Sequence, residues 1–146
     1  MNFWDSSALI PLLLREQMST RLRTLHARDR GLVVWWASRV ECTGVIARLN
    51  RESRLDESEA AGARQRLRFL FAYAEEIAPG AALRGRAERL LNTHPMSTAD
   101  ALQLAAALVW ASEQPTNRGF VALDRQLRRA AGREGFDVLP SDPELA

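Results

Sequence analysis

Short apolar runs alternate along this chain with longer stretches whose apolar residues recur every three to four positions. The short runs predict strands at 1–4, 32–36, 75–78, 120–123 and 136–139, the third of them a short edge strand because it carries two consecutive Glu residues. The amphipathic stretches predict helices at 8–14, 19–28, 38–49, 56–73, 82–91, 99–112 and 124–131.

Strands that alternate with helices indicate an α/β fold, here one domain built on a mostly parallel sheet flanked by helices. The chain has 146 residues, which suits a single domain. We expect that domain to span 1–139 and to be followed by an irregular tail at 140–146. The helix at 99–112 is apolar nearly all round, which predicts packing against both the sheet and neighbouring helices.

Composition narrows the chemistry that the chain can perform. Hydrophobic residues make up 47% and charged residues 26%, as in ordinary globular proteins. No signal peptide is recognised and every apolar run is interrupted before about 18 residues, so we expect a cytoplasmic protein without a membrane span. Cys42 is the only cysteine, which excludes a disulfide framework and a cysteine-built metal site. His26 and His94 lie far from the acidic motifs in sequence and are predicted at the surface, which argues against a zinc hydrolase.

The charge is unevenly distributed. The formal net charge is only +2, although residues 15–54 contain nine arginines against four acids. A basic first third is compatible with a phosphate-bearing partner, and a solvated arginine-rich helix face explains it equally well.

Four carboxylates stand where predicted helices begin. Asp5 follows the first strand, Glu41 lies in the first turn after the second, Asp100 lies in the first turn of the apolar helix, and Asp124 follows 120–123. In a parallel α/β sheet the helix N-termini lie along the carboxyl edge of the sheet, so these acids share one edge. Carboxylates that converge there raise one another's pKa unless a cation is present, and a hard divalent cation prefers such oxygen ligands.

A simpler interpretation is open for each of these acids. Asp5 and Asp124 have the position of helix N-caps, while Glu41 and Asp100 fit capping boxes with Ser38 and with a serine at position 97. The sequence alone does not separate capping from catalysis.

Four motifs in this order resemble PIN-domain proteins, specifically the VapC-type toxins of bacterial toxin–antitoxin pairs. The motifs are Asp5-Ser6-Ser7-Ala8-Leu9, Val40-Glu41 with Arg48, Thr98-Ala99-Asp100-Ala101-Leu102-Gln103-Leu104-Ala105, and Phe120-Val121-Ala122-Leu123-Asp124-Arg125-Gln126-Leu127. The resemblance covers about 1–139. It departs at Ala122, where the family often has Thr or Ser, and at Gln103, where His is frequent.

The resemblance implies a sheet in strand order 3-2-1-4-5 and a Mg²⁺- or Mn²⁺-dependent endoribonuclease. Asp5, Glu41 and Asp100 would be the core acids and Asp124 the fourth metal ligand and catalytic acid. Metal-activated water would hydrolyse an RNA phosphodiester. Family members form homodimers and are inhibited by a small antitoxin. The toxin–antitoxin pair binds DNA through that antitoxin.

Single-stranded RNA is usually held by arginines and stacked on aromatic rings. Ser6, Arg39, Arg125 and Arg128 lie beside the acids in sequence and are the candidate substrate contacts, although arginines on a solvated helix face fit the same pattern.

Two other functions are open. Aspartate-nucleophile phosphatases also begin with a strand that ends in Asp, but they need a second Asp where this chain has Ser7. A catalytically silent PIN-like module that only binds antitoxin or RNA is the alternative from another class.

Overall fold

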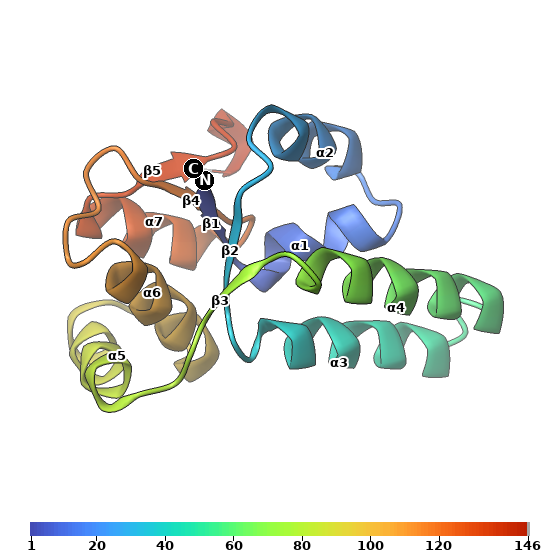
Figure 1. The fold of residues 1–146 in the computed structure, drawn as a ribbon, viewed down its shortest axis with the longest axis horizontal. Helices are drawn as coiled ribbons and strands as arrows, with labels where there is room; N and C mark the ends of the chain where they lie inside the picture. The colour runs from blue at the N-terminus through green and yellow to red at the C-terminus, as the bar shows by residue number, and fades with distance from the viewer. Residues whose placement is uncertain (146) are drawn as a thin grey trace.

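The computed structural model describes residues 1–145 and contains a five-stranded parallel sheet flanked by helices (Figure 1). The strand order is β3-β2-β1-β4-β5, with β1 in the centre, as the resemblance to PIN-domain proteins implies. The strands are β1 Asn2–Trp4, β2 Leu32–Trp35, β3 Glu75–Ile77, β4 Gly119–Val121 and β5 Asp137–Leu139.

Seven α-helices connect and cover these strands. Four belong to the first half of the chain, namely α1 Ser6–Leu13, α2 Ser19–Arg28, α3 Ser38–Arg51 and α4 Glu57–Phe71. The others are α5 Ala81–Thr93, α6 Thr98–Trp110 and α7 Arg125–Glu134. Among the described residues, no helix is long and apolar enough to cross a membrane.

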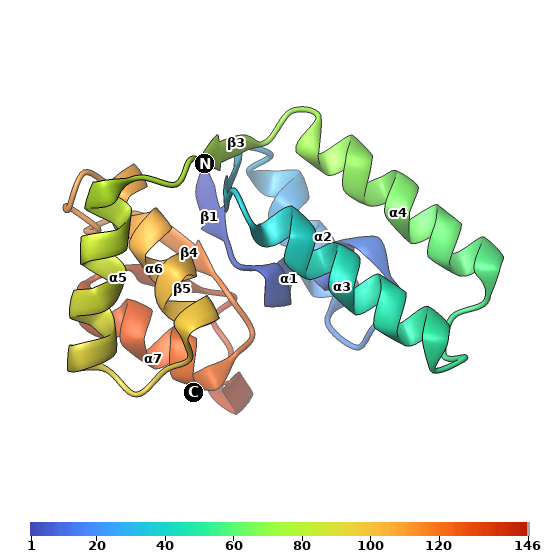
Figure 2. The same cartoon turned by 90° about the horizontal axis from the view of Figure 1, so that it is seen from below.

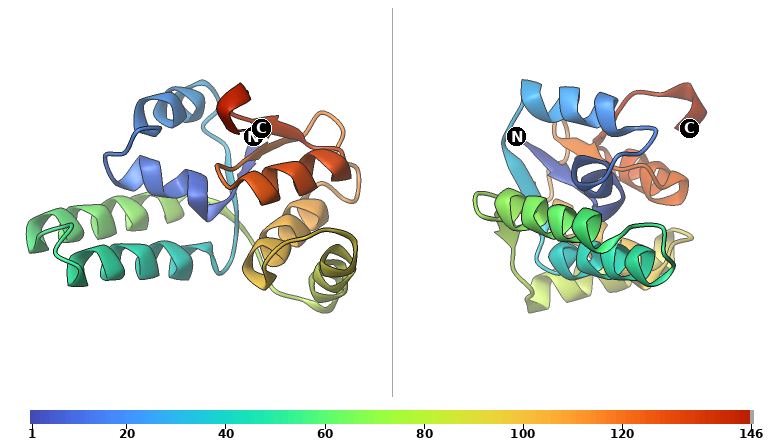
Figure 3. Two further views of the ribbon diagram at one scale, coloured as in Figure 1. Left: turned by 180° about the vertical axis from the view of Figure 1, so that it is seen from behind. Right: turned by 90° about the vertical axis from the view of Figure 1, so that its right-hand side faces the viewer.

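The two halves of the chain cover opposite faces of the sheet. Figure 2 shows α1 to α4 on one side and α5 to α7 on the other, and Figure 3 shows the same division from behind. Successive strand residues point to opposite faces, so Phe3 joins the core under α5 to α7 while Trp4 joins the core under α1 to α4. Val33 and Val34 divide in the same way, which explains why the inner strands read as unbroken apolar runs.

The third strand is the edge strand that its glutamates predict, because Glu75 and Glu76 are exposed. The tail after β5 carries one short element and one ion pair. A 3-10 helix spans Pro143–Leu145, and the Asp142 carboxylate pairs with the Arg21 guanidinium at 2.6 Å. This ion pair ties the end of the chain to α2.

Candidate active site

The centre of the candidate site is Asp5, at the junction of β1 and α1. Its backbone NH donates to the Val121 carbonyl at 2.9 Å, which fixes it against the end of β4. Its carboxylate caps α1 by accepting from the Ser7 NH at 3.0 Å and from the Ser7 hydroxyl. The Ser7 hydroxyl in turn accepts from the Leu123 NH at 3.0 Å. Asp5 is therefore the N-cap that its position predicts.

The Asp5 carboxyl is held in an environment that disfavours its charge. The residue is only 3% exposed. Burial raises its pKa to about 7, and the nearby Asp100 and Glu41 carboxylates add to this rise, while the hydrogen bonds from Ser7 oppose it. Both of those hydrogen bonds end on Oδ2, and within residues 1–145 Oδ1 accepts none. One oxygen of Asp5 therefore serves the helix and the other is free.

Glu41 is bound at both of its carboxylate oxygens. Oε1 accepts from the Gln103 amide at 2.7 Å, and Oε2 accepts from the Ser6 hydroxyl at 3.3 Å. Burial raises the pKa of Glu41 and Asp100 adds to the rise, although these hydrogen bonds lower it. The capping box with Ser38 is wrong: the N-cap of α3 is Ala37, and it makes no side-chain capping bond.

Gln103 is the residue of the candidate site that motif reading undervalued. Its side chain is fully buried on α6, one turn after Asp100, and its Nε2 lies 2.7 Å from Glu41, 2.9 Å from the Ser38 hydroxyl and 3.5 Å from the Ser6 hydroxyl. Its Oε1 is buried without a hydrogen-bond partner. The only signal for this role in the sequence is a polar residue in the middle of an apolar helix.

Asp100 and Asp124 complete the row of acids. The Ser97 hydroxyl caps α6 by accepting from the backbone NH of Asp100 at 3.2 Å. This capping bond does not use the Asp100 carboxylate. Burial raises the Asp100 pKa, and the nearby Asp124 carboxylate raises it further. Asp124 caps α7 by accepting from the Leu127 NH at 2.9 Å, and it is exposed. Ala122, two residues earlier, is fully buried and offers no hydroxyl.

These acids share one edge of the sheet, but they do not form a ready-made metal cage. Among residues 1–145, no three His, Cys, Asp or Glu side chains are grouped closely enough to enclose an ion. Mg²⁺ does not require such a cage, because it keeps several waters and takes only one or two carboxylates directly. The free Oδ1 of Asp5 and the half-buried carboxylate of Asp100 are of the kind that Mg²⁺ takes as ligands. Glu41 and Asp100 lie near enough to raise the Asp5 pKa, and Asp124 lies near enough to raise the Asp100 pKa.

The four candidate substrate contacts differ in exposure and in the hydrogen bonds that they make. Arg39 and Arg125 are exposed beside the acids in sequence, and the Arg125 guanidinium donates to the Glu144 carbonyl at 2.8 Å. Arg128 is buried, and its guanidinium donates to three backbone carbonyls between 2.7 and 3.0 Å. That guanidinium is committed to holding β4 and the β5 end together, so we do not assign it to RNA. Ser6 is partly exposed, and its hydroxyl donates to Glu41 at 3.3 Å.

The prediction of a surface position is wrong for His94. His94 is 7% exposed, and its Nε2 lies 2.7 Å from the Glu134 carboxylate, which also pairs with Arg89 at 2.8 Å. This cluster joins the end of α5 to the end of α7. His26 is half-buried, with its ring edge-on to Trp4 at 5.8 Å between centroids. Neither histidine joins the acids.

Comparison with known proteins supports the fold. No protein-family model matches the sequence, and no curated protein matches it. The structure resembles that of PAE2754 from Pyrobaculum aerophilum with a TM-score of 0.62 and 17% identity, over 94% of this chain and 88% of that one. It resembles FitAcB from Neisseria gonorrhoeae with a TM-score of 0.66 and 14% identity, over 96% of this chain and 97% of that one.

At such identities the likeness shows a shared fold and nothing more. It extends over almost the whole of each chain, so the match includes both helical layers and not only the sheet. With the strand order described above, it establishes the PIN-like α/β fold that the sequence predicts.

Proposed function

We propose that this protein is a metal-dependent endoribonuclease, the toxin of a type II toxin–antitoxin pair of the VapC kind. One observation carries the proposal: Asp5, Glu41, Asp100 and Asp124 stand along the carboxyl edge of a PIN-like sheet, and three of them have a raised pKa. Burial disfavours the charge of these three carboxylates and their acidic neighbours add to that cost, which a bound cation would offset.

The side chains divide into direct and indirect roles. Asp5 and Asp100 are the proposed direct ligands of Mg²⁺ or Mn²⁺, and Glu41 and Asp124 act through water or hold a second ion. When bound, such an ion supplies a nucleophilic water near neutral pH and offsets the charge that grows on the phosphate. Ser6 and Gln103 position Glu41, while the exposed Arg39 and Arg125 are the proposed contacts to the RNA phosphates.

Substitution of the proposed ligands tests the reaction. Asp5→Asn and Asp100→Asn each lower Mn²⁺-dependent, EDTA-sensitive cleavage of an RNA substrate by roughly a hundredfold or more. The matched control is Asp137→Asn, on the exposed side of β5, which cleaves like wild type. Circular dichroism verifies that each variant is folded. A folded variant that keeps the full rate removes its residue from the mechanism.

The alternative is a silent PIN-like module that binds antitoxin or RNA without cutting it, and it is favoured by the hydrogen bonds that both Glu41 oxygens already accept. Calorimetric titration with Mn²⁺, followed by the cleavage assay, separates the two proposals. No metal affinity together with no cleavage supports the silent module.

The proposal also names partners and a location. An RNA-cleaving toxin needs a cognate small antitoxin, and we propose that it works as a homodimer in the cytoplasm and meets DNA only through that antitoxin. Gel filtration of the chain alone and with its co-expressed neighbour gene product tests the assembly.

A further inference from the structure

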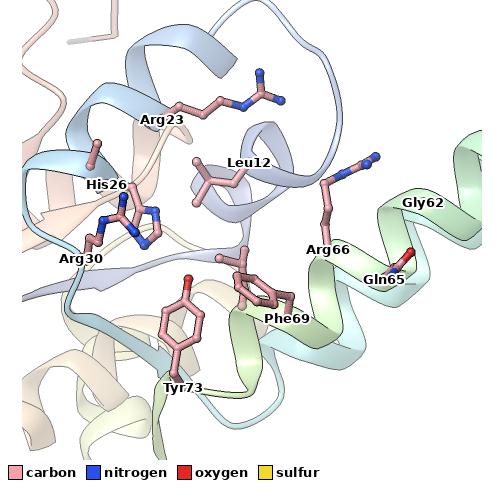
Figure 4. Close-up of a pocket in the computed structure, with 11 residues that line it drawn as sticks. Leu12, Arg23, His26, Arg30, Gly62, Gln65, Arg66, Phe69 and Tyr73 are labelled. Carbon is pink, nitrogen blue, oxygen red and sulfur yellow. The ribbon is translucent and has the colours of Figure 1, made fainter.

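A small hollow lies between the α5–α6 connection and one face of α7. Its volume is about 80 Å³, and it is lined by His94, Pro95, Gln126, Arg129, Ala130 and Arg133. Ligands of drug size take about 300 Å³ or more, so this α7 hollow has room for one small group. It lies on the α5–α7 side of the sheet (Figure 2), whereas the larger hollow in Figure 4 opens between α4 and the α1–α2 pair.

One stripe of α7 supplies the polar side chains of the α7 hollow. Gln126, Arg129 and Arg133 follow one another at spacings of three and four residues, so they project from the same side of the helix. Ala130, which is buried, lies beside them and leaves space that a longer side chain would fill. Both arginines are exposed, and within residues 1–145 neither forms an ion pair. Two cations therefore border the hollow with no acid of the described chain to neutralise them.

The opposite wall is fixed by a cluster of three side chains. His94 is buried, and its Nε2 lies 2.7 Å from the Glu134 carboxylate. The Arg89 guanidinium donates to the same carboxylate at 2.8 Å, so a cation of its own offsets the negative charge of Glu134. Glu134 itself does not line the hollow. The hollow is therefore preformed and positive, which favours an anion.

A phosphate group matches both the size and the charge of the α7 hollow. The arginine guanidinium presents a planar fork of N–H donors that fits phosphate oxygens, and such charge-assisted hydrogen bonds are about twice as strong as neutral ones. The Gln126 amide adds a neutral donor near the start of α7. In complexes with nucleic acids, contacts of this kind fix the position of the strand without reading its bases.

The α7 hollow adjoins the row of acids. Asp124 is the N-cap of α7, and Arg129 comes five residues later, about 7.5 Å along the helix axis. On the other wall, Pro95 comes shortly before Ser97, the N-cap of the helix whose first turn holds Asp100. An RNA strand that has one phosphate at the acids therefore reaches the hollow with a neighbouring phosphate.

We infer that the α7 hollow binds a phosphate of the RNA that flanks the scissile phosphate. The Arg129 and Arg133 guanidiniums donate to its oxygens, and the Gln126 amide donates a further hydrogen bond. The contact positions the strand and selects no base. The inference rests on the proposed function in naming RNA as the source of the phosphate, but these side chains take no part in the cleavage step.

RNA binding in EDTA tests this inference without any cleavage. The probe is a labelled oligouridylate, and fluorescence anisotropy measures its affinity over a series of salt concentrations. Arg129→Gln combined with Arg133→Gln weakens binding about tenfold or more. The same double change reduces the slope of log affinity against log salt by about 0.7, the value for one lost phosphate contact on a single strand.

The matched control removes the same charge from the other side of the sheet. Arg23→Gln combined with Arg30→Gln replaces two exposed arginines that line the hollow in Figure 4 and form no ion pair within residues 1–145. This control binds the oligouridylate within about twofold of wild type. Equal losses in the two double variants show a general effect of net charge and overturn the inference.

Two further variants and a kinetic reading separate positioning from catalysis. Arg129→Lys combined with Arg133→Lys keeps both charges but loses the planar forks, so it keeps the wild-type salt slope and recovers part of the affinity. In Mn²⁺, the glutamine double variant raises KM for RNA cleavage about tenfold and leaves kcat within about twofold, because the contact is the same before and during the reaction. Circular dichroism verifies that each variant is folded.

NMR of the wild-type chain identifies the source of the phosphate and needs no variant to fold. The side-chain Nε–Hε signals of Arg129 and Arg133 shift on addition of the oligouridylate. If they shift with inorganic phosphate and not with RNA, the hollow takes a free phosphate and the inference is wrong.

Failure of the inference and failure of the proposed function give different results. A glutamine double variant that binds and cleaves RNA like wild type overturns the inference and leaves the nuclease intact. A wild-type chain that binds RNA through these arginines in EDTA, but does not cleave it in Mn²⁺, refutes the nuclease and supports the phosphate contact.

Discussion

Replacing Asp5 by Asn should make the metal-free protein more stable, and more so at alkaline than at acidic pH. Asn keeps an oxygen that accepts from the Ser7 NH and hydroxyl, so the cap of α1 survives. What the change removes is a buried group whose charge is disfavoured, because burial raises the Asp5 pKa to about 7 from 3.8. The substitution therefore isolates the cost of ionising this carboxyl.

The sign follows from proton binding. Between the unfolded pKa and the folded pKa, the folded Asp5 holds a proton that the unfolded chain has released, so the free energy of unfolding falls as pH rises. The slope is about 1.4 kcal/mol per pH unit and it ends near pH 7. From pH 5 to pH 8 the wild-type chain thus loses about 3 kcal/mol that Asp5→Asn does not lose. For a chain of this size the difference is about 5 to 10 °C in Tm.

The assay is urea unfolding followed by circular dichroism at pH 5 and pH 8, in EDTA, for wild type, Asp5→Asn and the exposed control Asp137→Asn. The control should follow wild type at both pH values. Mn²⁺ should then stabilise the wild type and not Asp5→Asn, because an ion that binds only the folded state adds to its stability. If Asp5→Asn and wild type change in parallel between the two pH values, Asp5 is not a buried carboxyl with a raised pKa, and our account of the site fails.

Three further changes probe the surroundings of the site. Gln103→Leu should raise the Glu41 pKa further, since the Gln103 hydrogen bond lowers it, and an NMR titration of the carboxyl carbons measures the shift. Arg128→Met should lower the free energy of unfolding by about 2 to 4 kcal/mol, because the Ala122 and Pro140 carbonyls lose their donor while the Leu139 carbonyl keeps the Ala122 NH. Arg129→Met on the exposed side of α7 should have no such effect. Burial raises the Glu134 pKa, but hydrogen bonds from Arg89 and His94 outweigh it and lower the pKa overall. The ionised Glu134 carboxylate therefore stabilises the folded state above about pH 4.5, and this stabilisation is lost on acidification. Glu134→Gln should accordingly lose less stability than wild type between pH 6 and pH 3 in urea titrations.

Most of the fold was predictable because the spacing of apolar residues along the chain indicates which side chains are buried. Phe3 and Trp4 face opposite cores, and a strand buried on both faces is apolar at most of its positions. The edge strand was equally visible, because Glu75 and Glu76 can only be tolerated where a strand meets solvent. The ion pair between Asp142 and Arg21 was not visible, since it joins residues that no local pattern connects.

The hydrogen bonds that connect the residues of the site could not be predicted from the sequence for a similar reason. Gln103 meets Ser38 and Glu41 across more than 60 positions of sequence, and which of several polar residues a buried amide contacts depends on how α6 packs against α3. The predicted capping box between Ser38 and Glu41 was wrong for the same reason. A tertiary donor that reaches Glu41 competes with the local bond, and here it takes the carboxylate away from the helix start.

Capping and chemistry turn out not to be competing explanations for the acids. A carboxylate has two oxygens, and a helix cap occupies only one. Asp5 caps α1 through Oδ2 and Asp124 caps α7 through Oδ1, so each keeps one oxygen free of hydrogen bonds within residues 1–145. The caps fix both carboxylates at the edge where helix N-termini gather, and a positive helix end favours the negative charge that a metal ligand must carry. The same local bond that made each acid ambiguous in the sequence is what holds its free oxygen in place.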